Sequence, residues 1–107
     1  IQDKDEKTVL HFSLEDGYPN VAKLLIDSGA DINIQDEKGQ TPLHVALEHD
    51  HFDIFKLLIE RGADINIQAK NGQTVLHVSL ENGCLDISTM LIELSTVNEI
   101  DDSNLFR

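Results

Sequence analysis

The sequence predicts an all-α solenoid of stacked helix–turn–helix units with β-hairpin-like connecting loops. The main observation is that the segments TVLHFSL, TPLHVAL and TVLHVSL begin at Thr8, Thr41 and Thr74, in two steps of 33 residues. A second marker keeps this step, because GADINIQ begins at Gly29 and again at Gly62. A fixed period of this length is typical of arrays of small structural units that stack on one another.

The first helix of each unit is predicted from its ends. Thr41 suits the N-cap, because its hydroxyl can accept a hydrogen bond from a free backbone N–H of the first turn. Pro42 follows at the first helical position, where a missing N–H costs nothing. The helix is expected to stop near Asp50, whose equivalents are Gly17 and Gly83, since these residues tolerate the left-handed conformation that ends helices.

The second helix of each unit is predicted by an apolar stripe. In the middle unit, Ile54, Leu57 and Leu58 have the i, i+3, i+4 spacing of one helical face. The corresponding residues of the outer units are Val21, Leu24, Leu25, Ile87, Met90 and Leu91. Gly29 and Gly62 are expected to end this helix in the first two units.

The connecting loops contain a predicted turn. Asp36-Glu37-Lys38-Gly39 has Asp first and Gly fourth, as a type I turn favours. Glu6 replaces the Gly in the first unit and Ala69 replaces the Asp in the last, and we expect each to break the turn. At 95–98 the sequence is Ser-Thr-Val-Asn where GADIN would be expected, so the last unit is predicted to end atypically.

The 33-residue period, TPLHVA at 41–46 and GADIN at 29–33 and 62–66 closely resemble the ankyrin repeat. The resemblance covers residues 1–94. It implies that His11, His44 and His77 hydrogen-bond neighbouring turns. It also implies one domain over residues 1–107, divided into the tail of a preceding repeat (1–7), repeat 1 (8–40), repeat 2 (41–73) and repeat 3 with an atypical C-terminal end (74–107). Because 1–7 matches only the tail of a unit, a longer native array is expected.

Composition limits the choice of partner. The chain has 20 acidic and 8 basic residues and a formal net charge of −12. Such a field repels phosphate backbones and anionic lipid, so we expect no nucleic acid and no membrane as partners. A protein with a basic surface is expected instead, unless the acidity serves only solubility. Cys84 is the only cysteine, which fits a reducing compartment, so the cytoplasm is predicted, with the nucleus as an alternative.

The resemblance implies a protein–protein interaction module, an adaptor or scaffold segment, which binds through its fingertip loops (the tips of the connecting hairpins) and an acidic concave face. The alternative is a regulatory ankyrin domain of a larger enzyme or channel. No catalytic site is visible in the sequence, so the chain is predicted not to be an enzyme and to need no cofactor. A monomer is expected.

The variable contact positions of the family fall on the loops and on the ends of the first helices. They are Glu15, Asp16, Glu37, Lys38, Gln40, Glu48, His49, Lys70, Asn71, Gln73, Glu81 and Asn82, together with Lys4, Asp5 and Lys7 in the first loop. Glu15, Glu48 and Glu81 share one register, so stacking is expected to align them as an acidic ridge that receives Lys or Arg side chains. Alternatively, they are ordinary solvated helix ends.

Other chemistry is weakly indicated. Glu48-His49-Asp50-His51 is the one cluster that resembles a metal site, but its two His need not converge across a helix end, so no metal is predicted. Asn33 and Asn66 resemble ankyrin asparagines that a 2-oxoglutarate-dependent oxygenase hydroxylates. The alternative is that each Asn bonds the nearby backbone of its hairpin. Tyr18 stands at a turn between helices and is expected to pack.

Overall fold

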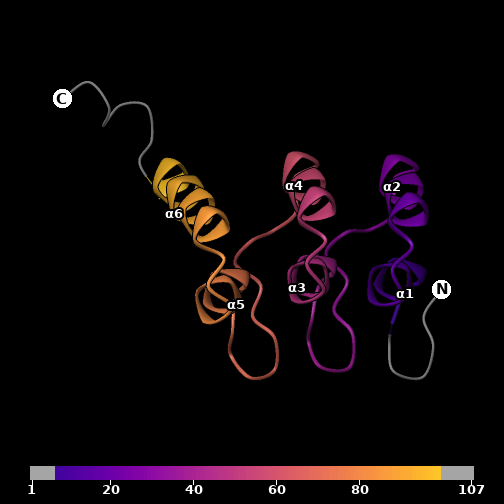
Figure 1. Cartoon of the computed structure of the whole chain (residues 1–107), viewed down its shortest axis with the longest axis horizontal. Coiled ribbons are helices and arrows are strands. Elements are labelled where there is room, and N and C mark those ends of the chain that lie inside the picture. Colours follow the sequence, from indigo (N-terminus) through magenta and orange to yellow (C-terminus); the bar gives the residue numbers. More distant parts are fainter. Residues whose placement is uncertain (1–6, 100–107) are drawn as a thin grey trace.

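The computed structural model describes residues 7–99 of the chain, with the side chains of residues 7–95. Its helices within this part are α1 (Val9–Glu15), α2 (Pro19–Asp27), α3 (Pro42–Glu48), α4 (Phe52–Glu60), α5 (Val75–Glu81) and α6 (Leu85–Glu99). They form three helix pairs. Figure 1 shows α1, α3 and α5 in one layer, α2, α4 and α6 in a second layer, and the loops on the far side of the first. The predicted all-α solenoid is confirmed.

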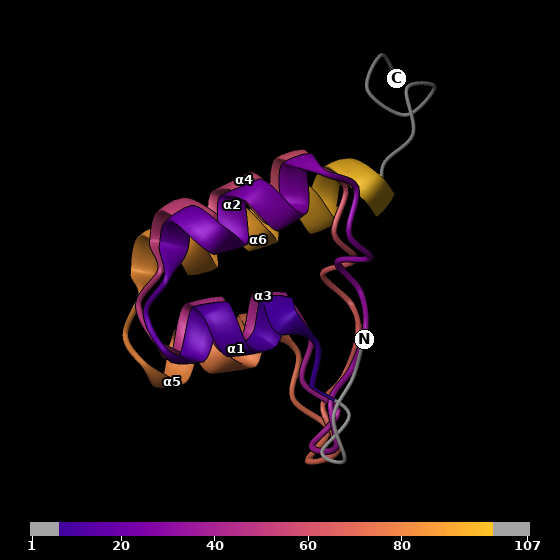
Figure 2. The same ribbon diagram turned by 90° about the vertical axis from the view of Figure 1, so that its right-hand side faces the viewer.

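The helix pairs are stacked in the same orientation. In Figure 2, which looks along the row, α3 and α5 lie behind α1, and the chain returns from the end of α2 and of α4 to a loop on the same side. The loop tips at 36–39 and 69–72 are the fingertip loops of the described chain. The first helices and the fingertip loops therefore present equivalent residues in rows, at intervals of one helix pair.

Each of the first two short helices begins at a capping Thr. The Thr8 hydroxyl accepts the backbone N–H of His11 at 3.2 Å, and the Thr41 hydroxyl accepts that of His44 at 3.5 Å. The N-cap predicted at Thr41 is confirmed, and Pro42 is the first residue of its helix. A Thr cap of this kind stabilises a helix by about 1 kcal/mol, which matters because each of these helices has only seven residues.

The first helices are followed by a residue in the left-handed conformation, as predicted. Its backbone angle φ is 80° at Gly17, 62° at Asp50 and 71° at Gly83. A β-carbon makes this conformation costly for most residues, whereas Gly adopts it freely and Asp more readily than most others. These three positions reverse the chain so that the second helix can run back along the first.

The second helices end differently in the third pair. In α2 the left-handed Gly29 ends the helix, and the next amide, that of Ala30, donates to the Leu25 carbonyl at 3.1 Å. α4 ends in the same way at Gly62. Ser95 stands at this position in α6. Without Gly the helix continues to fifteen residues, against nine in α2 and α4.

No helix in the described part of the chain is long and apolar enough to cross a bilayer.

The core is one apolar cluster shared by all three helix pairs. The stripe predicted for the second helix is confirmed, since Ile54 and Leu58 are buried and Leu57 is partly buried against the cluster. Phe55 lies outside that predicted stripe, yet it is the largest fully buried side chain. The apolar residues of the first helices complete the cluster, so no helix pair has a core of its own.

The fingertip loops close in the same way despite their different sequences. In both loops the fourth residue donates its N–H to the carbonyl of the first at 2.8 Å. The expectation that Ala69 breaks the turn is therefore wrong. Its lost Asp side chain is replaced, because Asn71 Oδ1 accepts the N–H of Gln73 at 3.0 Å, as the Asp36 carboxylate accepts that of Gln40 at 2.9 Å. Glu6, the other expected break, lies outside the described residues.

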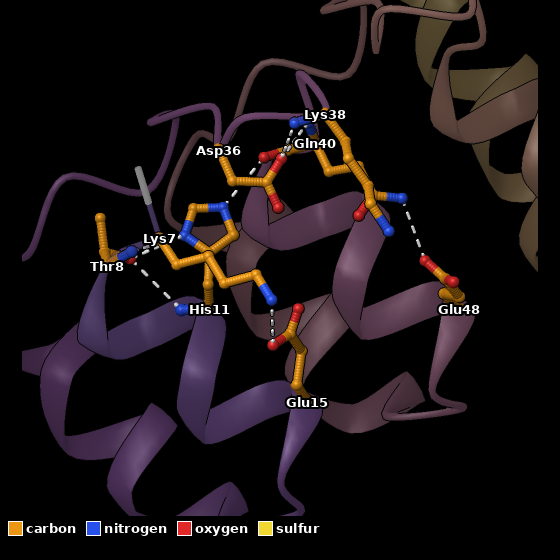
Figure 3. A network of polar contacts seen from close by, with 8 residues as sticks. All are labelled: Lys7, Thr8, His11, Glu15, Asp36, Lys38, Gln40 and Glu48. Carbon is orange, nitrogen blue, oxygen red and sulfur yellow. Dashed lines mark hydrogen bonds and ion pairs between the residues drawn. The ribbon is translucent and has the colours of Figure 1, made fainter. Parts of the chain in front are cut away.

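Histidines tie each helix pair to the loop before the next. His11 Nδ1 accepts the N–H of Thr8 at 3.1 Å, so its Nε2 carries the proton and donates to the Gln40 carbonyl at 2.9 Å (Figure 3). His44 makes the equivalent bond to the Gln73 carbonyl at 3.0 Å. The expected bonds to neighbouring turns are confirmed for both. The third, His77, accepts the N–H of its own N-cap residue at 3.1 Å.

Acid should weaken the fold through His44. Burial lowers the pKa of its imidazole below the ordinary value of 6.5, against opposite effects of the Gln73 carbonyl, Asp36 and Glu48. The unfolded chain therefore binds a proton at His44 that the folded chain excludes. The contribution to stability is fully present above pH 6.5 and is lost as pH falls from there through the lowered pKa, by up to about 1.4 kcal/mol per pH unit.

An NMR titration of the His44 ring protons measures this directly. The expected midpoint lies below 6.5, and urea unfolding should show a falling midpoint concentration over the same pH range. The same chain unfolded in urea gives the reference midpoint for His44. A His44 midpoint at or above 6.5 would contradict the prediction.

Candidate binding surface

Glutamates end the first helices at matching places. Glu15, Glu48 and Glu81 are the last residues of α1, α3 and α5. Glu48 and Glu81 are exposed, and Glu15 is half-buried. These helices lie next to one another in one layer (Figure 1), so the three carboxylates are at the same end of successive helices. They are the residues of the acidic ridge predicted from the sequence.

Each of these carboxylates is held by the residue eight positions upstream, where the loop returns to the helix. The pairs are Lys7–Glu15 at 3.0 Å, Gln40–Glu48 at 3.0 Å and Gln73–Glu81 at 2.7 Å. Figure 3 shows the first two. The sequence predicts all six residues as contact positions but does not indicate that they pair. The shared spacing of eight was the available signal, but no rule of helix or strand periodicity joins residues at that distance.

The pairs differ in charge. Lys7 forms an ion pair with Glu15, and its ammonium also lies 5.7 Å from the centre of the Phe12 ring. Gln40 and Gln73 donate hydrogen bonds but bring no positive charge. The carboxylates of Glu48 and Glu81 are thus oriented by the protein without being neutralised by these partners. We call Glu48 and Glu81, on the second and third helix pairs, the negative part of the acidic ridge, because the charge of Glu15 is balanced by Lys7.

The two fingertip loops form the walls of a shallow groove of about 440 Å³. It is lined by Glu37, Lys38, Gln40, Ala69, Lys70 and Asn71. All but Ala69 are predicted contact positions, so the structure brings two separate predicted sets onto one surface. The loops touch through their backbones, because the Lys70 N–H donates to the Lys38 carbonyl at 2.9 Å.

A side chain also fastens the fingertip loops to each other. Gln35 Nε2 donates to the Gly39 carbonyl at 2.8 Å within its own loop and to the Gln68 carbonyl at 3.0 Å in the next. One amide therefore fixes both the shape of the first loop and its distance from the second. These contacts fix the two walls of the groove relative to each other.

The remaining contact positions lie one residue beyond the acidic ridge. Asp16, His49 and Asn82 are the C-cap residues of the first helices, and all three are exposed. They extend the row of polar residues toward the turn that leads into the second helices. Lys4 and Asp5, predicted for the first loop, lie outside the described residues.

The two hairpin asparagines have different surroundings. Asn33 Oδ1 accepts the N–H of Asp64 at 2.9 Å, so this side chain links one loop to the next. No equivalent bond from the Asn66 side chain exists among the described residues. The interloop bond favours the structural interpretation for Asn33, and hydroxylation of either Asn stays a prediction.

One position distinguishes the turns between the paired helices. His51 Nε2 donates to the Leu14 carbonyl at 2.8 Å and so ties the second helix pair to the first. Cys84 stands at this position in the third pair and Tyr18 in the first. The expectation that Tyr18 packs is wrong, since 60% of this residue is exposed.

The described residues offer no metal site. Within residues 7–99, no three His, Cys, Asp or Glu side chains are grouped to hold a metal ion.

Comparisons with known proteins agree with this geometry. A family model described as "Ankyrin repeats (3 copies)" matches residues 1–69. That range includes the first two helix pairs and reaches the second fingertip loop, whereas α5 and α6 lie beyond it. A search of curated proteins found no match.

Proposed function

Because the chain belongs to the ankyrin-repeat family, we propose that it is an adaptor or scaffold segment that binds a partner through its fingertip loops and acidic ridge. Ankyrin repeats are generally protein-interaction modules and are typically non-catalytic. The proposed partner presents Lys or Arg side chains to the negative part of the ridge. Complementary charge of this kind speeds association and selects among partners more than it adds affinity.

The observation that carries the proposal is the orientation of two charged carboxylates by neutral amides. Gln40 fixes Glu48, and Gln73 fixes Glu81, without cancelling the charge. A side chain that is already held loses less conformational freedom when a partner binds, so more of the interaction energy is retained. Helix ends that served only solubility would need no such arrangement.

The ridge and the groove form one surface. Gln40 both lines the groove between the fingertip loops and orients Glu48. A partner segment in the groove would therefore meet Glu37, Lys38 and Lys70 at the loops and Glu48 beside them. None of these residues is aromatic, and interface hot spots are usually Trp, Tyr or Arg. We expect moderate affinity, with selectivity supplied by charge.

The double variant Glu48→Gln/Glu81→Gln should weaken binding of the partner about tenfold, because two surface ion pairs are lost. Glutamine keeps the oxygen that accepts the amide hydrogen bond, so the fold is preserved while the charge is removed. The measurement is affinity capture from cell lysate with quantitative mass spectrometry, followed by titration of the captured partner at low and high salt.

The chain offers a matched control. Glu60→Gln/Glu93→Gln removes the same two charges, also 33 residues apart, from exposed positions on α4 and α6. Partners that the control retains and the ridge variant loses would support the proposed surface. Identical partner sets for wild type and the ridge variant would show that the ridge does not bind. Equal losses in both variants would assign the effect to net charge.

A further inference from the structure

Two half-buried glutamines stand where one helix pair meets the next. Gln40 and Gln73 come directly before the capping Thr of α3 and of α5. Each uses its backbone N–H, its backbone carbonyl and its side-chain amide in hydrogen bonds to different parts of the structure. We call these two residues the linking glutamines, because their contacts join successive helix pairs.

The contacts of the first linking glutamine are shown in Figure 3. The Gln40 carbonyl accepts the Nε2 proton of His11 at 2.9 Å, and its side-chain amide donates to the Glu48 carboxylate at 3.0 Å. His11 is fully buried in the first helix pair, whereas Glu48 is exposed on the second. One residue therefore connects a buried side chain of one pair to a ridge carboxylate of the next.

The second linking glutamine repeats this order of contacts. The Gln73 carbonyl accepts the Nε2 proton of His44 at 3.0 Å, and its side-chain amide donates to Glu81 at 2.7 Å. His44 is buried in the second helix pair, and Glu81 is exposed on the third. The arrangement thus occurs at both boundaries between helix pairs.

The histidine supplies the contact that comes from another helix pair. The other backbone bonds of Gln40 are made to Asp36 in its own loop, at 2.9 Å each. Those of Gln73 are made to Ala69 and Asn71, also in its own loop. A glutamine side chain has several rotatable bonds, so it holds a carboxylate in one place only if its own backbone is fixed.

We propose that His11 and His44 are positioning residues of the acidic ridge, and that each orients the carboxylate of the following helix pair through a linking glutamine. The inference rests on the proposed function, because it concerns the surface assigned there. The order of contacts gives the effect a direction along the chain. A change at His44 should reach Glu81 and leave Glu48 as it is.

The third helix pair separates this role from helix capping. His77 accepts the backbone N–H of Thr74 at 3.1 Å, as His44 accepts that of Thr41 at 3.2 Å. Within the described residues, however, His77 makes no bond to a following loop. A substitution of His77 therefore alters the capping contact alone and serves as the matched control.

Two substitutions of His44 divide its contacts. An Asn side chain carries its oxygen near the place of Nδ1, so it can still accept the Thr41 N–H, but it is too short to reach the Gln73 carbonyl. A Gln side chain carries its amide nitrogen near the place of Nε2, so it can still donate to that carbonyl. His44→Asn should disturb Glu81, and His44→Gln should largely preserve it.

NMR of the glutamine side-chain amides measures the effect without a partner. In the wild type, one amide proton of Gln73 should be shifted downfield by its bond to the carboxylate. Glu81→Ala gives the reference for the free amide. The Gln73 signal should move to this reference in His44→Asn, but not in His44→Gln or His77→Asn. The Gln40 signal should stay unchanged in all of these variants.

Two NMR results would overturn the proposal. One is an unchanged Gln73 signal in His44→Asn. The other is an equal change at Gln40 and Gln73, because a general loosening of the fold would then explain both.

The exposed variant Glu81→Ala tests the same coupling without altering a buried residue. Coupling between two sites is reciprocal, so loss of the carboxylate should be felt at the histidine. The signal of the His44 Nε2–H group should shift, whereas that of His11 should not. An unmoved His44 signal would show that the contacts do not act together, and the proposal would fail.

Binding is tested with hexalysine, a peptide that presents only ammonium groups to the ridge. Titration at low salt, followed through the backbone amide signals of Glu48 and Glu81, should give a Kd at Glu81 about threefold weaker in His44→Asn than in His77→Asn. Equal affinities would overturn the positioning role. Failure of the proposed function would look different, because hexalysine would then leave both glutamate signals of the wild type unmoved.

Discussion

Replacing Phe55 with Ala should lower the free energy of unfolding by about 3–5 kcal/mol, the usual loss for a buried Phe. The ring is completely buried in the apolar cluster, on a helix that packs against α2 of the first pair and α3 of its own. The equivalent positions of the outer pairs hold only Ala22 and Ser88. The middle pair therefore contributes a much larger side chain to the core at this position than either outer pair does.

Thermal unfolding followed by circular dichroism measures this loss. At about 4–8 °C per kcal/mol for a domain of this size, the Tm should fall by at least about 12 °C. Phe52→Ala is the control, since Phe52 lies on the same helix but is 37% exposed. Its effect should be much smaller. Equal changes in the two variants would contradict the role assigned to Phe55.

Gly39→Ala should destabilise the fold by about 2–3 kcal/mol, from left-handed strain together with a lost interloop hydrogen bond. The residue has a φ of 76°, and an added β-carbon would lie 2.7 Å from the Lys70 backbone nitrogen and 3.1 Å from Ala69 backbone atoms. Backbone atoms cannot rotate away as a side chain can. The fingertip loops would have to separate, which breaks the bond from Lys70 to the Lys38 carbonyl.

Gly72→Ala separates the two causes. Gly72 has a similar φ of 84°, but nothing lies within 4 Å of its added β-carbon. This variant should lose only the about 1–2 kcal/mol of left-handed strain. Urea unfolding of both variants gives the difference. If Gly72→Ala is as unstable as Gly39→Ala, close packing of the fingertip loops does not contribute to stability.

The fold could be predicted because its signals are local. The capping Thr, Pro42 and the left-handed Gly residues determine where helices begin and end without help from distant contacts. The 33-residue period then fixes how the units stack. Ala69 shows the limit of such signals. Its backbone turn depends on hydrogen bonds that Asn71 supplies from a different position, so absence of Asp did not mean absence of the turn.

The burial of single residues was harder to predict than the fold. Phe55 is adjacent to the apolar stripe of its helix and is buried because helices cover α4 on more than one side, which a single-helix pattern does not reveal. Tyr18 was expected to pack at a turn, as its equivalent His51 does. It is exposed, and within the described residues no earlier helix pair stands where the first pair stands for His51. The burial of such residues therefore depends on whether another helix pair packs against them, which their position within the repeat does not tell.

The candidate surface was predicted as a set of positions without its internal contacts. Glu48 and Gln40 both appeared in that set, yet their hydrogen bond depends on the path of a loop, which spacing alone does not give. The same holds for the groove, whose two sides come from turns 33 residues apart. The sequence predicts which residues form the candidate surface, and the geometry shows which of their charges are compensated.

The continuation of α6 sets the direction in which the polypeptide leaves the third helix pair. α2 and α4 return the chain to the fingertip loops, whereas α6 carries it on to Glu99 within the second layer of helices, on the side opposite the loops (Figure 1). A label attached to an exposed residue of α6 such as Glu93 would therefore lie in the layer of the second helices. Immobilisation through such a label would leave the fingertip loops facing the solution in capture experiments.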